Sequence, residues 1–115
     1  MAKEVWCELY IDGRVSFKRL ASHVQKIVDG TIISKYWSRW TIESEFVSID
    51  VEINENRPVP KMAEDAQFLL RPFLVSAGEN PGALEGGFEQ VIRKLVLELR
   101  KQGLQVDLIA DFEVE

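Results

Sequence analysis

Residues Leu104–Glu115 read LQVDLIADFEVE, a stretch in which apolar and polar side chains alternate. The even positions are all apolar, and the odd positions are polar or acidic apart from Ile109. Because successive side chains of a β-strand point to opposite faces of its sheet, the alternation predicts a strand with one buried and one wet face. A sheet that is covered on one face only is typical of antiparallel architecture, whereas parallel sheets are buried on both faces.

The start of the chain shows the same alternation and predicts a strand over about residues 3–12. Its inward-facing set consists of Val5, Cys7, Leu9 and Ile11. Trp6 and Tyr10 share the opposite parity with Glu8 and Asp12, so we expect these two aromatic rings on the open face of the sheet.

Two stretches have the apolar spacing of helices. Ser16 is placed to cap a first helix, and Gly30 is placed to end it. A second helix has Asn80-Pro81 as a plausible start, but glycines weaken its first part, so the firm helix is expected from about Gly87 to Gly103. Its apolar stripe is Phe88, Val91, Ile92, Leu95 and Leu99.

Two more strands are expected between these helices. The first runs from about Thr41 to Asn54. Residues 31–40 are interpreted as its extended entry, since no Gly, Pro or Asn separates the two parts, and a separate paired strand over these residues is the alternative. After a loop over residues 54–61, the second runs from Ala66 to Ser76, although Pro72 cannot donate a hydrogen bond to a ladder.

The resulting order, βαββαβ, predicts a ferredoxin-like α+β sandwich formed by residues 1–115 as a single domain. Two helices would cover one face of a four-stranded antiparallel sheet whose strands, numbered along the chain, lie in the order 4-1-3-2. Strands two and four would form its edges. A fold of this kind does not assign a function.

The composition describes a small acidic protein of 115 residues with a net charge of −5 and a single cysteine. One cysteine excludes an internal disulfide and a cysteine-rich zinc site. The chain contains no apolar run of about 20 residues and no secretory signal, so a cytoplasmic location is expected and a membrane partner is not. Nucleic acid is not an expected partner either, because phosphate backbones repel an acidic surface. A basic protein would be attracted.

Residues with catalytic potential do not form a recognised motif. His23 is expected at the border of the first helix's apolar stripe and Cys7 in the core, so no catalytic residue, metal site or cofactor is predicted, and an enzyme is less favoured than a binding protein. The glycine-rich segment 80–87 lacks the lysine and the Ser or Thr of a nucleotide-binding loop.

The candidate interaction residues are aromatic or acidic. The aromatic group comprises Trp6 and Tyr10 on the open face and Tyr36, Trp37 and Trp40, which crowd around Arg39 and Lys35. The acidic group is Glu43, Glu45, Asp50 and Glu52, together with Glu55. The acidic run has three interpretations: a charged edge that resists aggregation, a docking site for a basic partner, or a metal site.

The open face is also expected to carry an apolar patch that needs a cover. Its further members would be either Phe68, Leu70 and Leu74 or Leu69, Phe73 and Val75, joined by Phe46 and Ile109. The chain's own loops, a second copy of the chain, a protein partner and stacked RNA bases are the alternatives for that cover.

Two functional hypotheses follow from these features. The first is a non-enzymatic protein-interaction module, in its sharpest form an immunity or antitoxin-like inhibitor of a basic protein. The second is a dimeric ferredoxin-like protein that binds or transforms a small molecule. A polar cavity would favour the second hypothesis, and a fully packed core would favour the first.

Overall fold

The computed structural model describes residues 6–54, 71–81 and 86–110. These residues form six strands and two helices, which follow one another as β1 (Trp6–Asp12), α1 (Phe17–Val28), β2 (Thr31–Lys35), β3 (Arg39–Glu43), β4 (Val47–Ile53), β5 (Phe73–Glu79), α2 (Gly87–Lys101) and β6 (Gln105–Ala110).

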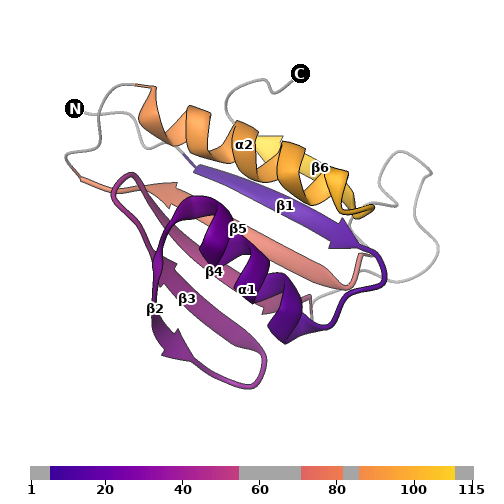
Figure 1. Ribbon diagram of the computed structural model, residues 1–115. Coiled ribbons are helices and arrows are strands. Elements are labelled where there is room, and N and C mark those ends of the chain that lie inside the picture. Colours follow the sequence, from indigo (N-terminus) through magenta and orange to yellow (C-terminus); the bar gives the residue numbers. More distant parts are fainter. Residues whose placement is uncertain (1–5, 55–70, 82–85, 111–115) are drawn as a thin grey trace.

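All six strands belong to one antiparallel sheet in the order β2-β3-β4-β5-β1-β6. The two helices contact each other and pack on the same face of this sheet, α1 against β4 and α2 against β6 (Figure 1). Both described helices lie on this one face, so the described residues form two layers, one of helices and one of strands.

The predicted four-stranded ferredoxin-like sandwich is therefore wrong. Residues 31–53 were expected to form one strand with an extended entry, but they form three strands with turns at 36–38 and 44–46. Neither turn contains Gly, Pro or Asn, which is why the sequence pattern did not reveal them. The extra hairpin moves the edge of the sheet to β2, so β4 is an interior strand and not an edge.

Helix α1 begins as its sequence predicts and ends differently. The Ser16 hydroxyl accepts a hydrogen bond from the Arg19 amide at 3.2 Å, which is the contact of an N-cap. The helix ends at Asp29, which takes the left-handed conformation with φ 52° that was expected of Gly30. Gly30 is required for space, since a Cβ there would lie 2.6 Å from Ile42 Cγ2 and 2.9 Å from the Glu43 carbonyl oxygen.

The second half of the chain also departs from its predicted boundaries. The strand expected over 66–76 is β5 at 73–79, with Pro72 just before it, while residues 66–70 lie outside the described part. Helix α2 begins at Gly87 as expected, but its N-cap is Gly86 at φ 79°, and Asn80 is not the cap.

The core lies between the helices and the sheet and is apolar. Of the residues expected to face inward on the first strand, Cys7 is 1%, Leu9 0% and Ile11 0% exposed, while Val5 lies outside the described part. Leu95 of α2 is 0% exposed. The largest fully buried side chains of the core also include Phe88, Leu20, Ile42, Ile49, Ile92 and Leu99. Neither described helix has the length and apolar character that crossing a membrane requires.

Candidate functional site

The strand registers place a set of polar side chains on the sheet face opposite the helices. One row across neighbouring strands consists of Thr41, Asp50, Ser76, Glu8 and Ile109. The row on one side of it consists of Arg39, Glu52, Leu74, Tyr10 and Asp107. The row on the other side consists of Glu43, Ser48, Gly78 and Trp6. We call these three rows, with Asp12, the open face.

The open face is acidic and not the apolar patch that the sequence suggested. Its carboxylates are Glu8, Asp12, Glu43, Asp50, Glu52 and Asp107. Phe73 and Val75 point into the core, and Phe46 packs against Gly87 at the start of α2. Leu74 and Ile109 remain on the open face, whereas residues 68–70 lie outside the described part.

Intramolecular hydrogen bonds fix several of these carboxylates. Thr41 Oγ1 donates to Asp50 Oδ1 at 2.6 Å, and the Tyr10 hydroxyl donates to Glu8 Oε2 at 2.7 Å. Each bond occupies one lone pair of its carboxylate, so the remaining acceptor sites stay open to a donor from outside. These hydrogen bonds fix the orientation of the carboxylates, so less side-chain entropy is lost when a partner binds to them.

Glu43 belongs to a network that joins three segments of the chain. The Ser48 hydroxyl lies 2.5 Å from Glu43 Oε1 and 2.6 Å from Asn80 Oδ1. Asn80 Nδ2 donates to the Ser44 carbonyl at 2.7 Å. The expected cap residue of the second helix therefore ties the turn between β3 and β4 to the end of β5.

The phenol of Tyr10 has a shifted acidity. Burial, the hydrogen bond to Glu8 and the negative charge of Glu8 together raise the pKa of Tyr10 from 10.0 to about 12, and burial is the largest of these causes. The folded protein thus favours the neutral phenol, and its contribution to stability is present below pH 10 and is lost as the pH rises toward 12.

We expect Glu8→Gln to lower the pKa of Tyr10 toward its ordinary value of 10.0, because two of its three causes depend on the Glu8 carboxylate. The tyrosinate absorbance of a Tyr36→Phe protein reports Tyr10 alone, since the chain has two tyrosines. Circular dichroism at each pH confirms that the protein is folded during the titration. An equal pKa of Tyr10 with and without the Glu8 carboxylate would contradict the described contact.

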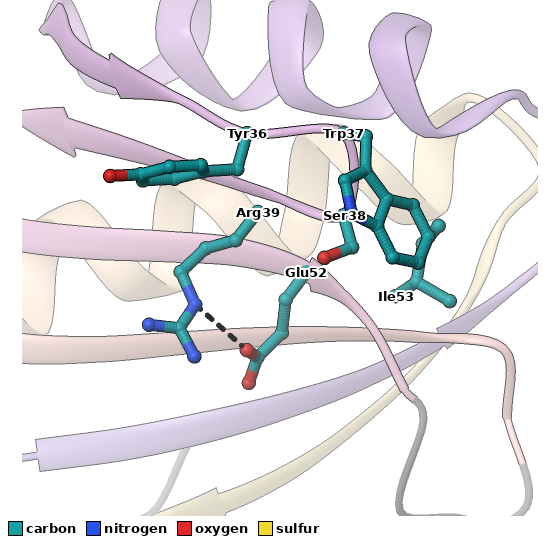
Figure 2. A pocket seen from close by; sticks show the side chains of 6 residues that line it. All are labelled: Tyr36, Trp37, Ser38, Arg39, Glu52 and Ile53. Atoms are coloured by element: carbon teal, nitrogen blue, oxygen red, sulfur yellow. Dashed lines mark hydrogen bonds and ion pairs between the residues drawn. The ribbon is translucent and has the colours of Figure 1, made fainter.

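An aromatic groove lies at one end of the open face, at the turn between β2 and β3. Its volume is about 290 Å³, and its lining consists of Tyr36, Trp37, Ser38, Arg39, Glu52 and Ile53. Tyr36 is 68% exposed and Trp37 is 79% exposed. Figure 2 shows the Tyr36 ring above the Arg39 side chain, the Trp37 ring on the other side of Ser38, and the Glu52 carboxylate facing Arg39.

Glu52 connects this groove with the open face. Its Oε2 lies 3.2 Å from Arg39 Nε, and the Arg39 side chain is 56% exposed. The Glu52 side chain is 24% exposed, so the pair is partly open to solvent, and an ion pair at a protein surface is worth only about 0–1 kcal/mol. A competing cation can therefore displace Arg39 at little cost. The groove therefore combines one carboxylate with two exposed aromatic rings, a combination that suits a cationic side chain.

The predicted interaction residues divide into a surface set and a core residue. Trp6 is 44% exposed on the open face, and Tyr36, Trp37 and Glu45 are exposed in turns. Trp40 is only 8% exposed: its ring meets Phe17 edge-on at 6.1 Å, and the Lys35 ammonium lies 4.5 Å from its centre. Trp40 is thus the core-covering member of its cluster and not part of the surface.

The acidic run also has a different position from the one predicted. Asp50 and Glu52 lie on an interior strand and point to the open face, so they do not blunt an edge. Sequence reasoning missed the partners of this run, Thr41 and Ser76, since only the register of β3, β4 and β5 brings them together. Within the described ranges no three His, Cys, Asp or Glu side chains are grouped to hold a metal ion.

Comparison of the chain with models of protein families, with curated proteins and with solved structures finds no match.

Proposed function

We propose that this chain is a protein-interaction module that binds a basic protein through the open face and the aromatic groove. The observation that carries the proposal is the set of carboxylates that the strand registers bring together on the open face, with exposed aromatic rings at one end. Two of these carboxylates, Glu52 and Asp107, pair with Arg39 and Arg71, and the other four have no ion pair among the described residues. Complementary charge steers encounter and selects the partner, and aromatic side chains supply the contact area of interface hot spots.

The groove supplies the anchor in this proposal. A lysine or arginine of the partner lies between Tyr36 and Trp37 and pairs with Glu52, while Arg39 turns outward. The rest of the partner surface lies along Asp50 and Glu8. A cation held against an aromatic face contributes about 0.5–2 kcal/mol, so the groove adds specificity to an otherwise general attraction.

The sharpest form of the proposal is an inhibitor that neutralises a basic toxin, as immunity and antitoxin proteins do. This form of the proposal rests only on an analogy, since the chain shares its small size and negative charge with immunity and antitoxin proteins as a class. The cytoplasmic location expected from the sequence stays a prediction within it. The alternative of a small-molecule-binding protein or enzyme has less support, because the groove is open to solvent.

An oligolysine peptide tests the proposal with the intact chain. We expect saturable binding, with backbone NMR shifts at Ser76 and Thr41 of the open face and at the groove. The double variant Glu8→Gln with Asp50→Asn removes two carboxylates and should weaken binding about three- to tenfold, since each exposed charge pair contributes up to about 1 kcal/mol.

The matched control is Glu89→Gln with Glu98→Gln, which changes the net charge equally on α2. It should leave the affinity nearly unchanged. Equal weakening in both double variants, or shifts that follow the helices instead of the open face, would refute the proposal. Helix α1 carries Lys18, Arg19 and Lys26 and no acidic residue, so a second copy of the chain could supply the basic surface. A concentration-dependent dimer in sedimentation of the protein alone would identify that second copy as the occupant of the open face.

A further inference from the structure

A second cavity lies away from the open face, where the segment between β1 and α1 meets the segment between α2 and β6. Its volume is about 160 Å³, and its lining consists of Arg14, Val15, Arg19, His23, Gln102 and Leu104. An open groove of about 640 Å³ adjoins it and shares Arg14, Gln102 and Leu104.

The polar lining of this cavity consists of Arg14, Arg19, His23 and Gln102, and most of its polar atoms are hydrogen-bond donors. Arg14 and Arg19 each carry a guanidinium with five N–H groups, and Gln102 adds a side-chain amide. No carboxylate lines the cavity. In the described part of the chain, the salt bridges involve Arg39, Arg71, Arg93 and Lys101, so Arg14 and Arg19 have no counter-ion there.

Local structure explains why these groups share one place. The Val15 amide donates to the Gly13 carbonyl at 3.0 Å in a tight turn, which sets Arg14 beside the start of α1. The Ser16 cap places Arg19 in the first turn of the helix, and His23 lies four residues later on the same side. Gly13, at φ 148°, allows Leu104 to close over the turn.

We propose that this cavity binds the phosphate group of a small phosphate ester. Two guanidinium groups match the oxygens of a phosphate in charge and geometry. The first turn of α1 adds the positive end of its helix dipole. The cavity is smaller than the roughly 300–1,000 Å³ of sites that enclose a whole ligand, so it fits one group, and the remainder of the ester lies in the adjoining groove.

The nearest negative groups restrict the position of the anion. Asp12 lines only the outer groove, where its carboxylate accepts the Gly13 amide at 2.7 Å. The carbonyl end of α2 also faces this region through Gln102 and Gly103. The phosphate therefore lies on the α1 side, between Arg14 and Arg19, and the uncharged part of the ester lies toward Gly103.

The single histidine of the chain provides the measurement. Methyl phosphate is added to the intact protein at fixed pH and ionic strength, with chloride as the balancing ion, and the imidazole resonances of His23 are followed by NMR. We expect a saturable shift with methyl phosphate and none with chloride. Arg14→Gln combined with Arg19→Gln should weaken the binding at least about tenfold, because two charged hydrogen-bond donors are lost.

The matched control is Lys18→Gln with Lys26→Gln, which removes the same charge from α1 but outside the cavity, and it should retain the affinity within about twofold. Since Arg19 is exposed, the single variant Arg19→Gln gives a second test with minimal effect on folding. Equal weakening in both double variants, a linear shift without saturation, or tighter binding of citrate than of methyl phosphate would overturn the assignment. The result is independent of the oligolysine experiment, which concerns the opposite face of the sheet.

Discussion

Trp40→Ala is expected to lower the free energy of unfolding by about 3–5 kcal/mol, the range measured for removing a buried aromatic side chain. Trp40 is 8% exposed and fills the space between the hairpin β2–β3 and the first turn of α1, where it contacts Phe17 and Lys35. Its loss leaves a cavity that a sheet and a helix end cannot readily close. Chemical denaturation followed by circular dichroism measures the change.

Trp37→Ala is the matched control, three residues away on the same hairpin. Trp37 is 79% exposed, so its removal should change the free energy of unfolding by less than about 0.5 kcal/mol. Under the proposed function, the same variant should weaken binding of the oligolysine peptide. If Trp37→Ala destabilised the fold as much as Trp40→Ala, the division of this aromatic cluster into a core and a surface member would be incorrect.

The difference between these two tryptophans could not be read from the sequence. Tyr36, Trp37 and Trp40 lie within five residues, and no turn residue marks the boundary at 36–38. Without a visible turn, residues 31–40 were interpreted as one extended entry to the next strand. The side of the sheet on which Trp40 lies gives no information about Trp37, because Trp37 belongs to the unrecognised turn. The register shift between Ile32 and Ser34 disturbs the alternation once more.

Strongly periodic segments were predicted more accurately. The alternation of Cys7, Leu9 and Ile11 correctly identified the buried side of β1. The predicted stripe of α2 identified four of its buried residues, Phe88, Ile92, Leu95 and Leu99, but it included the partly buried Val91 and missed Val96. In these segments burial and periodicity carry the same information, because each apolar side chain faces the core at the period of its element.

The candidate surfaces were predicted only in part, for a different reason. The identity of the acidic residues was visible, but their neighbours depend on the register of strands that are far apart in sequence, such as Asp50 beside Ser76. The cavity of Arg14, Arg19 and His23 depends on two connections that meet only in the folded chain. Sequence periodicity describes one element at a time and contains no information about such meetings.

Leu95→Ala is expected to cost about 2–5 kcal/mol of unfolding free energy. Leu95 is 0% exposed in the middle of α2, one turn from Leu99, which is also 0% exposed. Leu97 lies two residues further along the same helix and is 54% exposed, so Leu97→Ala removes the same atoms from solvent-exposed surface and should cost less than about 0.5 kcal/mol. Both variants carry the same helix propensity change, so their difference isolates the loss of packing against the sheet. Equal costs measured in urea would mean that α2 is rotated about its axis relative to the described packing.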